Sequence, residues 1–248
     1  MTLSDKSNPA GSSARPAFPD EKPYDPLAYD NLGHSISQAV LQRATVPMSS
    51  LPSFNGAGIY AIYYTGIHMP YPAYTALADA HSTAQFSRPI YVGKAEPSGA
   101  RKGKRDTLVI GMPLAKRLSD HVKSIRAASS TLSIDDFHCR YLVVEPVWIP
   151  LGESILINLT NPLWNVVVEG FGNHDPGKGR LSGVRPMWDT IHPGRPWAVK
   201  LPDRSEAVAE INNRITRFLG GDPSARLPEE AQEREADTDS DTPHTNVS

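Results

Sequence analysis

Two apolar segments bounded by glycine constrain the fold of this chain more than any other feature of its sequence. They are "GIYAIYYTG" at 58–66 and "RPIYVGKA" at 88–95. β-Branched and aromatic residues favour strands, and glycine within or beside a strand favours turns and close approach of another chain segment. The segments therefore predict two strands, and each carries one tyrosine beside a glycine, Tyr60 or Tyr91. A single strand tyrosine is usually a packing residue, but the repetition suggests an active site.

The other periodic segments predict helices around a small sheet. Apolar residues recur at helical spacing in "LGHSISQAVLQR" and "PLAKRLSDHVKSIRAAS", and the second begins with Pro113, which suits a first helical turn. Strands are expected over 57–64, 89–92 and 136–147, and helices over 32–43, 113–129, 151–159 and 206–221. A Gly/Pro/Arg-rich connection is expected over 172–200. This order predicts an α+β fold with a small sheet flanked by helices.

Composition divides the chain into one domain and two tails. Residues 1–30 are rich in proline, serine and charge, and residues 222–248 hold eight acidic and two basic residues. Neither segment has enough large apolar side chains to offset the entropy of ordering it. We therefore expect disordered tails at 1–30 and 222–248, and a single domain at 31–221.

The net charge of −2 hides a basic centre, because the C-terminal tail carries much of the acid. Residues 91–126 hold nine basic and three acidic residues. Such a basic stripe is typical of a protein that binds a polyanion. A solvated charged loop would have the same composition, so charge alone leaves both interpretations open.

Several classes of protein and site are excluded. The single cysteine, Cys139, can form neither an intrachain disulfide nor a cysteine-rich zinc site. The segment "GFGNHDPGKGR" resembles a phosphate-binding P-loop, but Gly179 stands where Ser or Thr must hold magnesium. There is no run of 18 apolar residues and no apolar signal segment at the N-terminus, so we expect a soluble cytoplasmic protein without a membrane partner.

Three further sets of polar residues are candidates for chemistry. Arg117 and His121 are four residues apart and share one face of their predicted helix. Glu153 lies among apolar residues at the start of the next helix, where it either interacts with the helix dipole or binds a hard cation. Asn165 precedes a run of valines and is either a cap residue or part of a site.

In this order the residues resemble one family. "GIY" at 58–60, "YVG" at 91–93, the Arg117–His121 pair, Glu153 and Asn165 together match the pattern of the GIY-YIG nuclease superfamily. The chain looks most like its type II restriction endonucleases that cut CCGCGG, to which "PLGESILINLTNPLWNVVVEGFGNHDPGKGR" is similar. His121 stands where many relatives carry tyrosine. The interval between the two tyrosines is longer than usual, which suggests extra DNA-binding or dimer elements.

The resemblance implies a GIY-YIG fold with insertions, in which a small antiparallel or mixed sheet brings both tyrosines into one site. Tyr60 would be the general base, with its proton passing to His121 or its phenol ionised by a nearby cation. A free tyrosine has a pKa of about 10, so the site is expected to lower it. Tyr91 would orient the water or the phosphate.

The resemblance also assigns the remaining polar residues. Arg117 would neutralise the scissile phosphate, and Glu153 would hold one Mg²⁺ ion, which Mn²⁺ could replace. Asn165 would fix the site through hydrogen bonds. The core motifs of this endonuclease domain span residues 57–165.

The implied partner is double-stranded DNA with a GC-rich palindrome. The residues expected to contact it are Lys94, Arg101, Lys102, Lys104, Arg105, Lys178, Arg180 and Arg185. One set of site residues cuts one strand, so a palindrome calls for a homodimer or a higher oligomer. Its interface is expected in the helix at 32–43 and the insertion at 65–88. A cognate DNA methyltransferase is the expected functional partner.

Two alternatives remain at this stage. The chain could be a repair or homing nuclease of the same superfamily, although it has no appended zinc or helix-turn-helix module. It could also be a non-catalytic DNA-binding protein on the same scaffold, although that reading predicts loss of Arg117 or Glu153, and both are present.

Overall fold

The structure is a computed structural model that describes residues 24–79, 86–97, 111–175 and 183–228. Six of the expected DNA-contacting residues lie outside these ranges, namely Arg101, Lys102, Lys104, Arg105, Lys178 and Arg180. The remaining site residues all fall within the described part of the chain.

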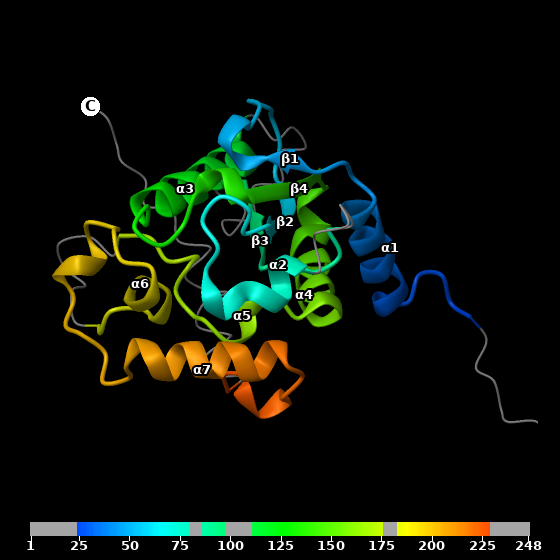
Figure 1. Ribbon diagram of the computed structural model, residues 1–248. Coiled ribbons are helices and arrows are strands. Elements are labelled where there is room, and N and C mark those ends of the chain that lie inside the picture. Colours follow the sequence, from blue (N-terminus) through cyan, green and yellow to red (C-terminus); the bar gives the residue numbers. More distant parts are fainter. Residues whose placement is uncertain (1–23, 80–85, 98–110, 176–182, 229–248) are drawn as a thin grey trace, which may run out of the picture.

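A four-stranded antiparallel sheet forms the centre of the fold (Figure 1). The strands lie in the order β1-β4-β2-β3, with bounds β1 (Val46–Pro47), β2 (Gly58–Tyr64), β3 (Tyr91–Ala95) and β4 (Phe137–Val143). The central strand β2 pairs with both β4 and β3, and all seven of its residues are buried. The α+β class is confirmed. The two-residue strand β1 was not predicted, because it is too short to show a periodic pattern of apolar residues.

Helices cover both faces of the sheet. α3 (Pro113–Ala127) lies on one face, whereas α1 (Tyr29–Leu41) and α4 (Ile149–Thr160) lie on the other (Figure 1). Side chains alternate along a strand, so Tyr60 joins the core on the α3 face and Ile59 joins the core on the α1 and α4 face. The sheet therefore separates two apolar layers.

Shorter elements complete the molecule. The closing helix is α7 (Val208–Leu219), which was expected over 206–221. The others are η1 (Met48–Ser50), η2 (Pro72–Tyr74), α2 (Thr75–Asp79), η4 (Ile134–Asp136), η5 (Pro146–Trp148), α5 (Leu163–Val166), α6 (Met187–Ile191), η6 (Ala198–Lys200) and η7 (Pro223–Ala225).

Proline and asparagine set the bounds of the two helices that carry site residues. Pro113 occupies the first turn of α3, where its missing N–H costs nothing. α4 begins at Ile149, two residues before the expected start, and ends at Thr160, where it is capped by Asn161 with a left-handed φ of 47°. Glu153 therefore lies beyond the first turn of α4, and its interpretation as a helix-dipole residue loses its basis.

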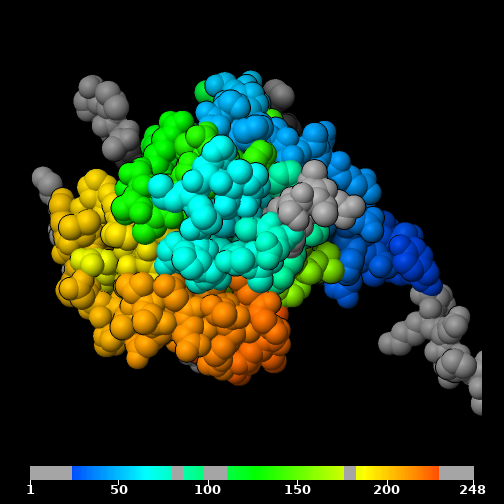
Figure 2. Space-filling view, viewed as in Figure 1, coloured from blue at the N-terminus to red at the C-terminus, as the bar shows by residue number. Residues whose placement is uncertain are grey.

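The expected insertion at 65–88 packs within the same chain over its described part. The Asp136 carboxylate accepts a hydrogen bond from the backbone N–H of His68 at 2.7 Å. Farther along, the Tyr71 hydroxyl donates to Asn212 of α7 at 2.9 Å. Figure 2 shows this segment (cyan) at the surface between α3 (green) and α7 (orange). These contacts give the insertion an intramolecular partner, which weakens the sequence argument that it needs a second subunit.

The expected connection at 172–200 is part of the core in its described portion, from residue 183 onward. α6 buries Met187, Trp188 and Ile191, and η6 buries Ala198. The sequence gives no periodic apolar pattern that would predict their burial, because they come from short helices and irregular segments.

The ordered fold is longer at both ends than the sequence predicts. α1 begins at Tyr29, inside the expected N-terminal tail. At the other end, Ala225 is buried and the backbone N–H of Leu227 donates to the carbonyl of Val166 at 2.8 Å. Residues 222–228 therefore belong to the domain rather than to a tail. Across the described residues, no helix combines the length and apolar character needed to cross a membrane.

Candidate active site

Two strand tyrosines converge on the α3 face of the sheet. In the β2–β3 register Tyr60 lies opposite Gly93, and Tyr91 lies opposite Ile62. The two tyrosines are thus diagonal neighbours on one face, with ring centroids 6.2 Å apart. A Cβ atom at Gly93 would lie 2.4 Å from the Tyr60 hydroxyl oxygen. The glycine of "YVG" is therefore required by the position of the Tyr60 ring.

Gly58, the glycine of "GIY", is required by a different contact. A Cβ atom there would lie 2.0 Å from the backbone carbonyl oxygen of Leu142 on β4. Any side chain at this position would push β4 away from β2. The glycine motifs thus fix the sheet and the tyrosine positions together.

The hydroxyl of Tyr60 forms a hydrogen bond with Nε2 of His121, at 2.6 Å. Both groups are buried, at 0% and 2% exposure. Burial lowers the pKa of His121 well below its usual value, and Arg117 lowers it further. The imidazole is therefore neutral, and its Nε2 accepts a hydrogen bond from the Tyr60 hydroxyl. Burial raises the pKa of Tyr60 to about 12, although Arg117 opposes this rise.

This direction corrects the expectation that the site lowers the Tyr60 pKa. The protein's own groups raise it, because removing water from the phenolate costs more than Arg117 returns. Tyr60 is consequently a protonated phenol at neutral pH, poised to donate to His121.

A second buried Tyr–His pair shows that such a hydrogen bond alone does not define a site. The Tyr74 hydroxyl lies 2.7 Å from Nε2 of His192, whose other ring nitrogen lies 2.9 Å from the hydroxyl of Thr131. The Trp164 indole N–H donates to Tyr74 at 2.9 Å. Each of these four side chains, Trp164, Tyr74, His192 and Thr131, therefore has a hydrogen-bond partner within the protein. The Tyr60 pair differs because it has an arginine and a carboxylate close by.

Arg117 lies beside the Tyr60–His121 pair and is 7% exposed. Its guanidinium donates to the carbonyl oxygen of Gly172 at 2.8 Å and to the imidazole of His174. Burial lowers the pKa of His174 to about 4, and Arg117 is the next largest cause of this shift. The His174 imidazole is therefore neutral and accepts the hydrogen bond from Arg117. His174 was not a predicted site residue. It lies 57 residues from Arg117 in an aperiodic segment, which gives no sequence signal for the contact.

Phe171 closes the inner side of the site. Its ring stacks on the His121 imidazole, with centroids 4.5 Å apart and planes 16° apart. It also meets the Tyr91 ring edge-on at 4.9 Å. The His121 imidazole, which projects from α3, is thus packed against the segment that follows α5.

Glu153 approaches from the other face of the sheet. It projects from α4 and is 6% exposed, and Oε2 lies 2.7 Å from Nζ of Lys94 on β3. Burial raises the pKa of Glu153, whereas Lys94 opposes the rise most strongly and Arg117 also lowers it. Arg117 therefore acts electrostatically on both Tyr60 and Glu153. The structure thus brings the tyrosines, Arg117, His121 and Glu153 into one neighbourhood.

Asn165 holds the edge of the sheet. Its side-chain oxygen accepts from the backbone N–H of Val92 at 2.8 Å, and its amide donates to the carbonyl of Val92 at 2.9 Å. The side chain thus replaces a neighbouring strand along β3. Asn165 touches the residue after Tyr91, so it positions the tyrosine strand.

The comparison with known families decides the identity of this arrangement. The sequence model described as "Eco29kI GIY-YIG domain" matches residues 52–219, which is more than half of the chain. The chain belongs to this family of restriction endonucleases. No curated protein matches the chain. The GIY-YIG fold that the sequence predicted is thereby confirmed, and the protein is a nuclease of restriction type.

A divalent cation is compatible with the carboxylate of this GIY-YIG domain. Magnesium binds through one or two carboxylates, with water and substrate phosphate completing its shell. Glu153 supplies one carboxylate, and Glu96 is near enough to raise its pKa. Within the described ranges, no group of three or more histidine, cysteine or acidic residues could form an all-protein metal cage. The donor set thus fits a cation shared with a phosphate.

Two of the basic residues expected to contact DNA in this nuclease have protein partners. Lys94 pairs with Glu153, as described above. Arg185 forms an ion pair with Asp203 at 2.6 Å and donates to the carbonyl oxygens of Ala198 and Leu201 at 3.2 and 3.3 Å. The roles of Lys94 and Arg185 in DNA binding stay predictions. Each side chain would have to contact DNA while keeping these protein partners, or give them up.

Proposed function

We propose that this chain is a type II site-specific endonuclease that hydrolyses phosphodiester bonds in double-stranded DNA at a GC-rich palindrome, CCGCGG. Membership of the Eco29kI GIY-YIG family supports the nuclease activity. The observation that carries the catalytic assignment is the 2.6 Å contact between the Tyr60 hydroxyl and a neutral His121 beside Arg117. The isolated Tyr74–His192 pair lacks this electrostatic setting.

The proposed proton path runs from water through Tyr60 to His121. As the water oxygen bonds to phosphorus, its proton passes to the Tyr60 oxygen while the phenol proton passes to Nε2 of His121. A raised phenol pKa makes this relay more favourable than prior formation of a free phenolate. The Tyr91 hydroxyl orients the water or the phosphate from the same face of the sheet.

Arg117 and Glu153 stabilise the charges of the reaction. The Arg117 guanidinium neutralises the scissile phosphate as negative charge accumulates there. Glu153 holds Mg²⁺, or Mn²⁺ in its place. The bound cation would supply positive charge to the phosphate and to the 3′ oxygen that leaves as its bond to phosphorus breaks.

Recognition of the target is assigned to basic residues around this site. Arg and Lys read guanine through O6 and N7 in the major groove, which suits a GC-rich palindrome. The candidates remain Lys94, Arg101, Lys102, Lys104, Arg105, Lys178, Arg180 and Arg185. Alanine variants that lose affinity only for the cognate site would identify base contacts, whereas a loss for all sequences would identify phosphate contacts.

The active form is proposed to be a homodimer, or a higher homo-oligomer, that cuts the two strands of the palindrome. Near the start of α1, Tyr24, Leu27 and Tyr29 are 77%, 74% and 67% exposed. This apolar end of α1 supports the predicted contribution of the first helix to the interface. Such an enzyme would act with a DNA methyltransferase that protects the same sequence in the host.

Digestion of plasmid DNA carrying CCGCGG tests the proposal, with Mg²⁺, Mn²⁺ or a chelator in parallel reactions. The expected result is one set of discrete fragments that requires the cation and disappears after methylation of the site. Selective nicking of branched DNA would instead favour a repair nuclease. Binding without cleavage under all conditions would favour a non-catalytic protein. Sedimentation with a cognate duplex tests the oligomer.

A further inference from the structure

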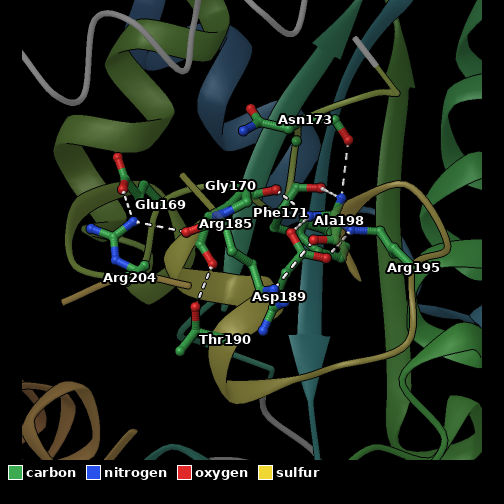
Figure 3. Close-up of polar contacts among 12 residues, drawn as sticks. Glu169, Gly170, Phe171, Asn173, Arg185, Asp189, Thr190, Arg195, Ala198 and Arg204 are labelled. Atoms are coloured by element: carbon green, nitrogen blue, oxygen red, sulfur yellow. Dashed lines mark hydrogen bonds and ion pairs between the residues drawn. The ribbon is translucent and has the colours of Figure 1, made fainter. Parts of the chain in front are cut away.

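One buried arginine outside the proposed catalytic motifs joins a carboxylate of α6 to the carbonyl groups of one turn. Arg195 is 3% exposed. Its Nε and Nη2 donate to the two carboxylate oxygens of Asp189, and Nη2 donates to the carbonyl oxygen of Gly170 at 2.6 Å. Nη1 donates to the carbonyl oxygens of Phe171 and Asn173 at 3.1 and 3.0 Å (Figure 3). An arginine has five N–H donors in a rigid fork, and each has an acceptor here.

Two tryptophan rings fix the plane of this guanidinium. The central carbon of Arg195 lies 4.7 Å from the ring centroid of Trp188 and 4.7 Å from that of Trp197. These two ring contacts, together with hydrogen bonds from all three guanidinium nitrogens, restrict the orientation of the group. The carbonyl oxygens that it binds are therefore held at fixed positions.

The turn held by Arg195 is the one that contacts the catalytic residues. Phe171 supplies the ring stacked on His121 at 4.5 Å. Gly172 supplies the carbonyl oxygen that accepts from Arg117 at 2.8 Å. The carbonyl groups on either side of Gly172 both point to Arg195, so moving this arginine would move both contacts.

We propose that Arg195 is a positioning residue for the nuclease site. Through the turn at 170–173, it sets the orientation of the His121 imidazole and of the Arg117 guanidinium. It does not touch the reacting atoms. The effect on cleavage rests on the proposed function, whereas the effect on His121 can be measured without any substrate.

A neighbouring arginine provides a matched control. Arg204 donates to the carboxylate of Glu169 at 2.6 Å and to the carbonyl oxygen of Arg185 at 3.3 Å (Figure 3). It thus anchors the residue just before the turn but binds none of the carbonyl oxygens of 170–173. A general loss of stability in this region would affect both arginines, whereas positioning of the site depends only on Arg195.

The test compares Arg195→Lys with Arg204→Lys. Lysine keeps the charge but loses the planar fork, so it cannot bind the carboxylate and three carbonyl groups together. The first measurement is the NMR spectrum of the His121 ring protons without DNA, because Phe171 shields them. The second is the single-turnover cleavage rate of cognate DNA beside its Kd.

We expect Arg195→Lys to shift the His121 signals downfield and to slow cleavage about 10- to 100-fold, as small misplacements in active sites do. The Kd for DNA should stay within about threefold of wild type, since positioning acts on the reaction step. Arg204→Lys should leave the His121 signals and the cleavage rate unchanged, even if its Tm falls as much. Wild-type His121 signals in Arg195→Lys would overturn the proposal.

A milder variant keeps the test decisive if Arg195→Lys does not fold. Trp197→Leu removes one of the two ring contacts of Arg195 and none of its hydrogen-bond partners. It should shift the His121 signals in the same direction by a smaller amount, and unchanged signals would contradict the positioning role. If the wild-type protein cuts no DNA under any condition, the proposed function fails while the NMR comparison still decides the role of Arg195.

Discussion

The ammonium group of Lys94 lies 2.7 Å from the carboxylate of Glu153, and their side chains are 15% and 8% exposed. This pair joins a residue expected to contact DNA to the residue expected to hold the cation. Lys94 opposes the effect of burial on Glu153 and so favours the ionised carboxylate. The same lysine would compete with the proposed cation for that carboxylate, so the two proposed roles would be coupled.

Lys94→Met is expected to shift the acid limb of the cleavage pH profile to higher pH. Removing the ammonium raises the Glu153 pKa further, so a higher pH is needed to ionise the cation ligand. The measurement is the single-turnover rate against pH at sub-saturating Mg²⁺. Lys123→Met, which removes an exposed lysine paired with Asp120, is the control. An acid limb at its wild-type position in Lys94→Met would contradict the coupling.

Glu153→Gln is expected to abolish Mg²⁺-dependent cleavage and to leave DNA binding without a divalent cation nearly intact. The amide keeps the size of the side chain but removes the charge that binds the cation. Cleavage and mobility-shift assays on the same duplex check this. Glu145→Gln, at an exposed position before η5, should behave as wild type. Substantial cutting by Glu153→Gln would remove this residue from the site.

Tyr60→Phe is expected to slow cleavage about 10²- to 10⁴-fold or more, the scale of lost general-base catalysis. It should also lower stability by about 1–3 kcal/mol, because the buried His121 loses its hydrogen-bond partner. The ring keeps its packing, and only the hydroxyl is lost. Tyr74→Phe is the matched control, because it breaks the other buried Tyr–His hydrogen bond. It should lower stability by about 1–3 kcal/mol and leave the cleavage rate unchanged. If Tyr74→Phe slowed cleavage and Tyr60→Phe did not, the Tyr74–His192 pair would be the catalytic one and the present assignment would be wrong.

Gly93→Ala is expected to reduce cleavage strongly, because the added Cβ would lie 2.4 Å from the Tyr60 hydroxyl oxygen. The ring must move away from His121 or β3 must shift. Gly183→Ala is the control, since no atom lies within 4 Å of its added Cβ. Cleavage rates and circular dichroism of both variants separate a displaced tyrosine from a lost fold. Equal rates for the two variants would show that the site tolerates the displacement.

The unfolding free energy is expected to fall as the pH drops from 7 toward 4. Burial lowers the pKa of His192 from 6.5 to about 3, so the unfolded chain takes up this proton first. The stability linked to His192 is full above about pH 6.5 and is lost as the pH falls toward its folded pKa. Its size is on the order of a few kcal/mol, since one pKa unit is worth about 1.4 kcal/mol.

Urea unfolding of wild type and His192→Gln at several pH values checks this dependence. The variant is expected to be less stable at pH 7 and to lose less stability on acidification. Glu153 and Asp189 have raised pKa values caused by burial. Stability linked to these carboxylates is lost as the pH rises through their folded pKa, so they act in the opposite direction. An identical pH slope in both proteins would show that His192 is not the source.

The candidate site residues were accessible from the sequence in two ways. The i, i+4 spacing puts Arg117 and His121 on one side of α3, which needs only neighbouring residues. The convergence of Tyr60 and Tyr91, which lie on different strands, was implied by the resemblance to the GIY-YIG superfamily and depends on the register of β2 and β3. The structure places all four side chains together.

The supporting contacts were not accessible, because they join segments that have no period. Phe171, His174 and Arg195 lie outside helices and strands, and most of their contacts join them to backbone carbonyls or side chains far along the chain. The pairing of Lys94 with Glu153 depends on α4 packing against the edge of the sheet, which no local pattern specifies. The direction of the Tyr60 pKa shift depends on complete burial, which the sequence leaves open.

The sheet divides the active site between two separately packed layers. Tyr60 lies in the apolar layer under α3, the helix that carries His121. Lys94 lies opposite Ile59 of the other layer and pairs with Glu153 of α4. In the proposed mechanism, neither layer alone contains the complete set of groups for hydrolysis. A partly unfolded chain would therefore lack the proposed cutting activity until both layers have docked onto the sheet.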